Sequence, residues 1–221
     1  MRQGESHVHG YLCEVYLRQT PPLLKALASH LIWNGPAQVH GENAVYLTFD
    51  DGPHPEITLE VLDLLDEYEA KATFFLVGEN VRRYPDIVER ITNAGHAIGL
   101  HSNSHISGWK TKDEVYFADI KASAEVISSN LLRPPYGEIT LSQAKALKKE
   151  YKLIMWSDLS ADFDASYSSE QCFAFATKKV KAGSIIVFHD NEKAKPRIIE
   201  ALRLSLAFYR DKGFCMEPIQ L

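Results

Sequence analysis

Short apolar runs alternate with longer amphipathic segments along most of the chain. The short runs have the length of buried strands, and the segments between them have the length and spacing of helices. Such alternation is typical of βα repeats around a parallel sheet. The predicted strands are 45–50, 72–77, 96–101, 131–134, 153–157, 184–189 and 214–219. The predicted helices are 56–69, 84–94, 112–128, 141–151, 169–181 and 195–212.

Several helix ends are marked by residue patterns of known geometry. In a capping box, a hydroxyl side chain and a Glu or Gln three positions later satisfy backbone amides that lack partners in the first turn. Capping boxes are predicted at Thr111 with Glu114, Thr140 with Gln143, and Ser168 with Gln171. Gly95 and Gly183 follow two of the helices, where a residue in the left-handed conformation is expected.

The domain organisation predicted from the sequence is simple. The chain contains no low-complexity run and no linker rich in Pro, Gly or Ser. We therefore expect one α/β domain with about seven parallel strands, after an N-terminal extension over residues 1–43. Within the extension, the apolar segment Pro22–Trp33 is interrupted by Lys25 and His30 and is predicted to be an amphipathic helix packed on the domain. The alternative is a degenerate membrane anchor.

The composition excludes several classes of partner. Hydrophobic residues make up 45% and charged residues 24% of the 221 residues, as in soluble globular proteins. The net charge of −5 offers no basic surface for nucleic acid or an anionic membrane. No apolar run approaches the ~20 residues of a membrane span, and Met1–Gly10 has no apolar core of the secretory type. As written, the chain is predicted to be cytoplasmic, with cell-envelope association as the alternative.

The three cysteines do not suggest a disulfide framework or a zinc site. Cys13, Cys172 and Cys215 lie far apart and are odd in number. No pair has the spacing of zinc ligands. We expect reduced and mostly buried thiols.

Unusual polar residues follow the predicted strands. Because the carboxyl ends of parallel strands meet on one face of a barrel, these residues are expected to lie close together, where active sites are built. They are Asp50, Asp51, His101, His105, Arg133, Tyr136, Asp158, Asp162, His189 and Asp190.

Asp50 and Asp51 stand side by side at the end of an apolar strand. Two adjacent carboxylates are costly to bury without a cation or a shared proton. Such a pair suits a site in which one acid binds a metal and its neighbour acts as a base. The alternative is a simple hairpin, because Asp-Gly is a strong turn dipeptide.

His101 and His105 are separated by three residues, a spacing that suits two ligands of one ion. Asp51 supplies a third ligand. Two His and one carboxylate leave coordination positions open for water and substrate, which is typical of a catalytic metal site. The alternative is a pair of solvated loop histidines.

Arg133 and His189 have both structural and functional interpretations. The segment around Arg133 could be a stiff extended stretch, because two prolines follow it. Its guanidinium could instead hold Asp50 ionised through a bidentate contact. His189 could be a core histidine, but its place after an apolar strand and before Asp190 favours a strand-end acid or base.

These blocks, in this order, resemble the polysaccharide deacetylases of carbohydrate esterase family four, the group typified by nodulation-factor chitooligosaccharide deacetylase. The resemblance covers about residues 44–215 and is carried above all by Thr-Phe-Asp-Asp-Gly-Pro at 48–53 and His-Ser-Asn-Ser-His at 101–105. It implies a distorted, TIM-like (β/α) barrel with its catalytic domain at 44–221. The implied reaction is metal-dependent hydrolysis of an N-acetyl group on a glycan or oligosaccharide, such as a chitooligosaccharide or peptidoglycan.

The resemblance also implies a role for each residue of the first blocks. Asp50 would be the catalytic base, positioned by Arg133. Asp51, His101 and His105 would bind a divalent metal, most often zinc, with cobalt, nickel or manganese as alternatives.

The remaining implied roles belong to later blocks. His189 would be the general acid, and the amide of Tyr136 would help to hold the oxyanion. The substrate pocket would be lined by Val187, Trp156, Phe163 and Pro135.

The fourth block departs from the family pattern, which usually has two acids three residues apart followed by Trp. Alignment from Trp156 places Leu159 at the first acid, Asp162 at the second and Phe163 at the Trp. We expect Asp162 to tune His189, with Asp158 as the second choice. Phe163 keeps an aromatic wall but lacks the indole donor.

Two other functions use the same residues. The site could act on xylan acetyl esters or on an amide that is not part of a sugar, and the departures in the fourth block keep this alternative open. The third hypothesis is a barrel that binds glycan without catalysis. The complete set of competent side chains argues against it, because function depends on the site and not on the fold.

Overall fold

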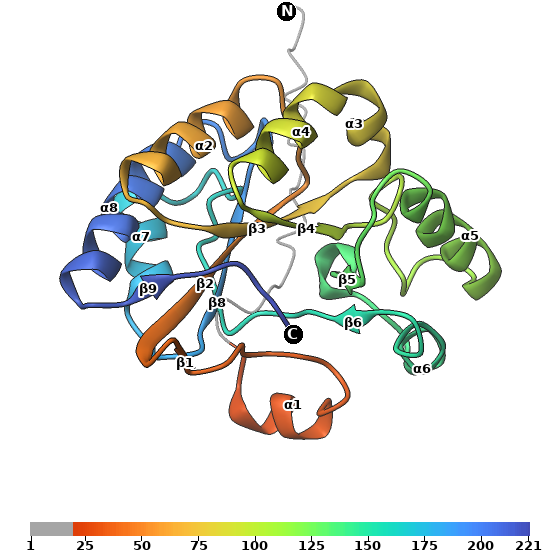
Figure 1. Ribbon diagram of the computed structural model, residues 1–221. Helices are drawn as coiled ribbons and strands as arrows, with labels where there is room; N and C mark the ends of the chain where they lie inside the picture. Colours follow the sequence, from red (N-terminus) through yellow and green to blue (C-terminus); the bar gives the residue numbers. More distant parts are fainter. Residues whose placement is uncertain (1–19) are drawn as a thin grey trace, which may run out of the picture.

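The computed structural model describes residues 20–221 and is shown in Figure 1. The predictions for Met1–Gly10 and Cys13 lie outside this range. The helices are α1 Pro22–Leu27, α2 Ile57–Glu67, α3 Gly78–Arg83, α4 Pro85–Asn93, α5 Asp113–Ala124, α6 Leu141–Leu147, α7 Ser169–Thr177 and α8 Ile198–Asp211. The strands are β1 Gln38–Val39, β2 Glu42–Asp50, β3 Ala72–Leu76, β4 Ala97–Leu100, β5 Leu131–Leu132, β6 Lys152–Leu153, β7 Asp158–Leu159, β8 Ile185–His189 and β9 Cys215–Met216.

Seven parallel strands form a curled half-barrel in the order β6-β5-β4-β3-β2-β8-β7. Strand β9 also runs parallel to the first part of β2, whereas β1 pairs antiparallel with β2. Helices α2 to α8 surround the sheet, and α1 lies apart at the lower end of Figure 1. The prediction of an α/β barrel with about seven parallel strands is confirmed.

The central strands are buried on both faces, which explains their continuous apolar runs. The residues of β2 from Ala44 to Phe49 and those of β8 from Ile185 to Phe188 are at most 1% exposed. Side chains alternate between the faces, so Tyr46, Thr48 and Asp50 share one face of β2. An apolar cluster around Tyr46 fills that face near the strand starts. The polar residues therefore lie at the strand ends, beyond a packed apolar base.

The N-terminal segment completes one side of the sheet. Ile32 exchanges backbone hydrogen bonds with Leu153 and Met155 at 2.8 and 2.7 Å, and the amide of Gly35 bonds to the carbonyl of Gly183 at 2.9 Å. This segment thus joins β6 to the residues just before β8. The helix predicted over Pro22–Trp33 ends at Leu27, because the following residues leave the helix to make these sheet contacts. The domain boundary near residue 44 stays a prediction.

Two capping boxes are confirmed and one is wrong. Thr140 and Ser168 accept hydrogen bonds from the amides of Gln143 and Gln171, whose side chains bond back. At α5 the cap position is instead Lys112, with no side-chain hydrogen bond, so Thr111 does not cap the helix. Gly95 and Gly183 have φ of 81° and 87°, the left-handed conformation predicted for them.

The remaining differences concern short elements. Helix α3 and strand β1 were not predicted, because six and two residues are too few for a periodic pattern. The strand predicted over 153–157 is interrupted. Its first part pairs with β5 and the following residues cross to β8, which produces β6 and β7.

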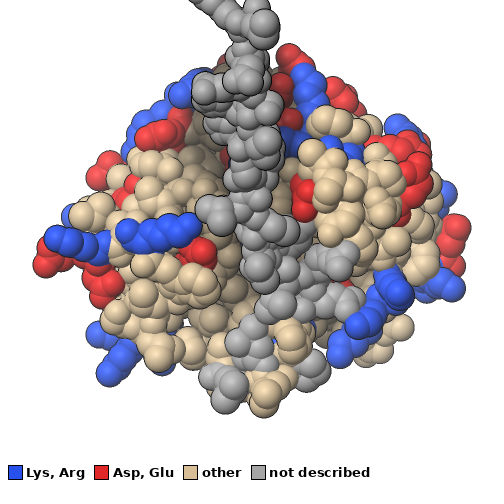
Figure 2. Space-filling model, turned by 180° about the vertical axis from the view of Figure 1, so that it is seen from behind, with Lys and Arg blue, Asp and Glu red and all other residues tan. Residues whose placement is uncertain are grey.

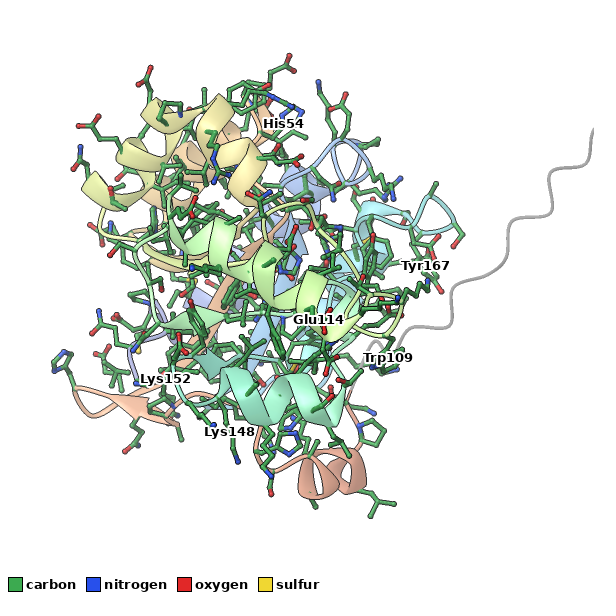
Figure 3. All side chains as sticks on the ribbon, turned by 90° about the vertical axis from the view of Figure 1, so that its right-hand side faces the viewer. His54, Trp109, Glu114, Lys148, Lys152 and Tyr167 are labelled. Atoms are coloured by element: carbon green, nitrogen blue, oxygen red, sulfur yellow. The ribbon has the colours of Figure 1, made fainter. Side chains whose placement is uncertain are left out.

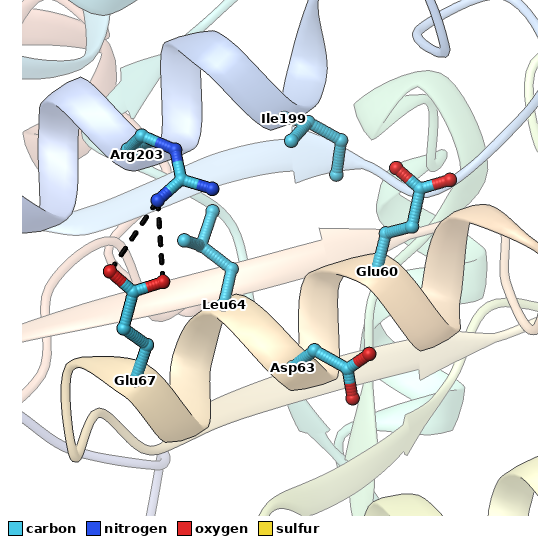
Figure 4. Close-up of a pocket in the computed structure, with 6 residues that line it drawn as sticks. All are labelled: Glu60, Asp63, Leu64, Glu67, Ile199 and Arg203. Carbon is cyan, nitrogen blue, oxygen red and sulfur yellow. Dashed lines mark hydrogen bonds and ion pairs between the residues drawn. The ribbon is translucent and has the colours of Figure 1, made fainter.

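The outer surface carries mixed charges. Basic and acidic side chains are interspersed around the face seen in Figure 2. Among the described helices, none combines the length and the hydropathy that crossing a membrane requires. A shallow groove runs between α2 and α8, and in it Glu67 is paired with Arg203 (Figure 4). It lies on the outer helices and not at the strand ends.

The capping results give a paired test of local stability. Ser168→Ala removes the acceptor of the Gln171 amide and is expected to lower the free energy of unfolding by about 1 kcal/mol. Thr111→Ala removes a similar hydroxyl that caps nothing, and the expected change is less than about 0.5 kcal/mol. Urea unfolding of both variants measures the difference. Equal losses would contradict the assigned helix starts.

Candidate active site

The structure gathers the predicted polar residues on the face where the parallel strands end. The residues brought together are Asp50, Asp51, His101, His105, Arg133, Tyr136, Asp162 and His189. Asp158 is not among them. It begins β7, and its carboxylate accepts hydrogen bonds from the hydroxyls of Ser157 and Ser184 at 2.7 and 3.2 Å. Its predicted place at a strand end is wrong because the strand predicted there is split.

Asp51, His101 and His105 form a compact cluster. Asp51 Oδ1 lies 3.4 Å from His101 Nε2 and 2.9 Å from His105 Nε2. One donor atom from each residue lies within 4.8 Å of the others. His101 is buried, and the other two residues are half-buried.

Hydrogen bonds on the far side of each imidazole orient the cluster. His101 Nδ1 lies 2.8 Å from the carbonyl oxygen of Arg133, which can only accept. Nδ1 therefore carries the proton, and Nε2 of a neutral His101 presents a lone pair to the cluster. His105 Nδ1 lies 3.1 Å from the hydroxyl of Tyr136, whose ring packs edge-on at 4.7 Å. Such outer hydrogen bonds usually support histidines that bind metals.

The cluster fits a divalent cation. Burial raises the pKa of Asp51, but its contacts with His101 and His105 and the charge of His189 hold that pKa well below the usual range. The carboxylate is therefore ionised at neutral pH. Its Oδ1 is buried, and apart from the two imidazoles it has no hydrogen-bond partner among the described residues. An ionised oxygen facing two imidazole nitrogens without a proton donor is an arrangement that a bound cation satisfies.

Two asparagines that were not predicted hold Asp51 in place. Asn191 Nδ2 donates to Asp51 Oδ2, and Asn80 Nδ2 donates to the Asp51 backbone oxygen at 2.9 Å. The amide of Asn191 cannot turn freely, because its Oδ1 accepts from the Ala194 amide at 3.0 Å. Asn191 thus occupies Oδ2 and leaves Oδ1 directed at the histidines.

Asp50 and Arg133 form a buried ion pair beside the cluster. Arg133 has no exposed surface, and its NH1 donates to Asp50 Oδ1 and to Thr48 Oγ1, both at 2.7 Å. The predicted bidentate contact is wrong, because Arg133 NH2 instead donates to the carbonyl of Met155 at 3.1 Å. Burial lowers the pKa of Arg133, and the charge of Asp50 acts in the opposite direction.

His189 stands on the other side of Asp50, with which it is paired in the sheet. Its Nδ1 lies 2.8 Å from Asp162 Oδ1, and its backbone amide donates to Asp162 Oδ2 at 2.9 Å. Burial lowers the pKa of His189, but the charge and hydrogen bond of Asp162, together with Asp51 and Asp50, raise it to about 9. The imidazole is therefore protonated at neutral pH. Of the two acids considered from the sequence, Asp162 is the one that contacts it.

Asp190 is a buried acid whose function the sequence did not suggest. Burial raises the pKa of Asp190 to about 8. The charges of Asp51 and Asp50 also raise this pKa, whereas the hydrogen bond from Thr58 lowers it. Asp190 packs closely on Gly52: a Cβ atom added to Gly52 would lie 2.2 Å from Asp190 Oδ2. Protonated Asp190 therefore supports the turn that carries Asp51.

Five of the seven non-glycine residues with positive φ in the described range lie at this face, and the other two are His40 and Glu69. Asp51, Ser102, His105, Tyr136 and Ala161 have φ between 56° and 81°. The left-handed conformation costs a non-glycine residue about 1–2 kcal/mol. Strain of this kind persists where the surrounding structure fixes it and is concentrated at functional sites. It re-aims the side chains that follow β2, β4 and β5.

The four predicted pocket residues lie around the same site. Val187 shares a face of β8 with His189. Phe163 contacts the His189 ring edge-on, with centroids 4.8 Å apart. Trp156 lies over Gly137, and Pro135 is buried in the turn before it. Their part in substrate binding stays a prediction.

Comparison with known proteins agrees with these blocks. The polysaccharide deacetylase family model matches residues 37–153. A peptidoglycan-N-acetylglucosamine deacetylase of Bacillus cereus is 32% identical over 84% of this chain and 89% of its own length. Another from the same organism is 41% identical over 54% of this chain, which spans only 46% of that protein.

A third relative and a solved structure extend the comparison. A chitooligosaccharide deacetylase of Bradyrhizobium is 27% identical over 82% of this chain and 91% of its own length. The crystal structure of a peptidoglycan N-acetylglucosamine deacetylase, in complex with a naphthalenyl N-hydroxybenzamide, superimposes with a TM-score of 0.78. It is 32% identical and covers 85% of this chain and 89% of its own.

The contact between Asp162 and His189 can be tested by titration. Asp162→Asn removes the charge that raises the pKa of the imidazole, so that pKa is expected to fall well below about 9. NMR titration of the His189 ring measures it. Asp158→Asn is the matched control and is expected to leave the value unchanged, because Asp158 bonds to serines. A shift in the control alone would contradict the assignment.

Proposed function

The chain belongs to the polysaccharide deacetylase family, and we propose that it hydrolyses the N-acetyl groups of a glycan built from N-acetylglucosamine. The observation that carries this proposal is the position of the metal-type cluster beside a carboxylate paired with a buried arginine and an imidazole paired with a buried carboxylate. Asp50 is paired with Arg133, and His189 is paired with Asp162. A base, an acid and a cation site on one face are the parts that amide hydrolysis needs.

The cation site is assigned to Asp51, His101 and His105. A divalent cation, most often zinc, would polarise the acetyl carbonyl and lower the pKa of a bound water there. The protein keeps both imidazoles directed inward through Arg133 and Tyr136. Open positions in this donor set leave room for the substrate.

Asp50 is assigned as the base. It is 4% exposed, and its Oδ2 is the oxygen left free by Arg133, 3.9 Å from His101 Nε2. This places a carboxylate oxygen next to the cation site, where it can accept the proton of the attacking water. The fixed contact with Arg133 keeps that oxygen in position.

His189 is assigned as the acid. Asp162 holds Nδ1, so Nε2 is the nitrogen from which a proton can pass to the departing amine. An amine anion is a very poor leaving group, and a protonated imidazole beside it removes that obstacle. The amide of Tyr136, in its left-handed turn, is assigned to the developing oxyanion.

The substrate class follows from the relatives. Those named above act on peptidoglycan N-acetylglucosamine or on chitooligosaccharides, which share the N-acetylated sugar. A peptidoglycan substrate would place the protein at the cell envelope. A xylan acetyl ester is the alternative substrate for the same site. Phe163 replaces the Trp that is usual in the family, and this difference in the proposed pocket keeps the alternative open.

The reaction is tested by acetate release from N-acetylglucosamine oligomers, peptidoglycan and acetylated xylan, with added zinc or cobalt. Release from the amino sugars is expected, and Asp50→Asn is expected to lower kcat by at least about a hundredfold because it removes the base. Removing metal with a chelator should abolish activity reversibly. Retained activity in both the variant and the chelated protein would sink the mechanism, and release from xylan alone would favour the ester.

Metal binding is tested separately from activity. Asn191→Ala removes the donor to Asp51 Oδ2, and we expect zinc affinity to fall by about 10–100-fold, the usual effect of losing such support. Competition with a chromophoric chelator measures the affinity. Asn93→Ala, the same change at an exposed residue at the end of α4, is the control. Equal affinities in the two variants would contradict a supporting role for Asn191.

A further inference from the structure

Trp109 is a large apolar side chain left in solvent. It is 64% exposed, although a tryptophan is usually well buried. A single exposed apolar residue is ordinary on a protein surface, so exposure alone carries no argument. The position and the fixation of this one are what distinguish it.

The indole is held by its polar edge. Trp109 Nε1 donates to the carbonyl of Ile139 at 3.0 Å. The donor is therefore already used, and the part of the side chain that remains available to a ligand is the apolar ring. A ring fixed in advance loses little conformational freedom when a ligand binds to it.

Two neighbouring loops connect Trp109 to the cation site. At one end, His105 Nδ1 contacts the hydroxyl of Tyr136 at 3.1 Å. Further along, the amide of Gly108 bonds to the carbonyl of Glu138 at 3.1 Å, and then Trp109 bonds to Ile139. The segments 105–109 and 136–139 thus run side by side, with the cation site at one end and the exposed indole at the other.

Trp109 lies close to the cation site along the chain. Trp109 follows His105 by four residues, so their Cα atoms lie at most about 14 Å apart. Tyr136, which is 56% exposed, lies on the same pair of loops. In Figure 3, Trp109 is on the side of the molecule opposite Lys152, the first residue of β6, and therefore toward the face where the strands end.

We propose that Trp109 is a stacking platform for a sugar ring of the glycan adjacent to the sugar that is deacetylated. This inference rests on the proposed function and names the residue that selects chain length. One face of a pyranose presents C–H groups, which pack against the apolar face of an aromatic ring. The ligand is a linear oligosaccharide of N-acetylated sugars, with its reacting acetyl group at the cation site and a neighbouring unit on the indole.

The test compares Trp109→Ala with Trp109→Phe on N-acetylglucosamine oligomers of increasing length. For the Ala variant, kcat/KM is expected to fall by about tenfold on long oligomers, because KM rises while kcat stays the same. On the shortest oligomers that react, kcat/KM is expected to stay unchanged. The Phe variant keeps a ring and is expected to retain most of the activity. Val115→Ala, a change of an exposed apolar residue on α5, is the control.

A binding measurement keeps this test independent of catalysis. Calorimetry with a long oligomer and the metal-free protein is expected to show weaker binding for Trp109→Ala than for Trp109→Phe, with equal thermal stability of both variants. If the wild type binds the long oligomer more tightly than Trp109→Ala does but releases no acetate in the activity assay, the proposed reaction is wrong and the proposed stacking on Trp109 is supported. Loss of activity that is equal at every oligomer length, or binding by the Ala variant as tight as the wild type, would overturn the proposal.

Discussion

A guanidinium with no exposed surface needs partners for its charge and for its N–H groups, or it destabilises the fold. Arg133 meets this requirement with Asp50, Thr48 and two backbone carbonyls beyond β6, while its guanidinium lies 4.1 Å from the centroid of the Phe75 ring. Its own carbonyl accepts from His101 Nδ1. One buried residue therefore fixes the proposed base, the tautomer of a proposed metal ligand and the relative positions of β2, β5 and β6. A change at Arg133 would alter all of these together.

The charges around Arg133 favour a cation at the proposed metal site. Asp50, Asp51 and Asp162 lie within one region, and in the described part of the chain the cationic side chains paired with their carboxylates are Arg133 and His189. Asp190 avoids adding a fourth negative charge because burial and the neighbouring carboxylates raise its pKa to about 8. The unpaired Asp51 Oδ1 is where the compensation is incomplete. A divalent cation at that oxygen would balance the site, and it would also reduce the attraction that keeps His189 protonated.

The strand ends could be predicted from the sequence because each predicted site residue follows an apolar run, and parallel strands bring those positions together. Asp162 could be ranked above Asp158 by alignment, and the structure adds its contact with His189. Asn191 and Asn80 could not be found in the same way, and for Asp190 the strand-end position was predicted but not its contact with Gly52. Their roles depend on which side chain reaches Asp51 or Gly52 across the fold. The false cap at Thr111 shows the same limit, since a short local pattern does not determine where a helix begins.

The chemistry and the substrate selection lie on different parts of the structure. The proposed base, the proposed acid and the metal ligands Asp51 and His101 are at or next to strand ends, where neighbouring strands fix them, whereas His105 lies on the loop after β4. Phe163 and Trp109 are on loops, the first against His189 and the second beyond His105. Loops tolerate substitution better than the strands that they connect. A replacement such as Phe163 for the usual Trp would therefore change a proposed wall of the substrate pocket, while Asp162 still contacts His189 from the preceding position. With this arrangement, the proposed hydrolytic site could be directed to a different glycan by changes confined to the loops.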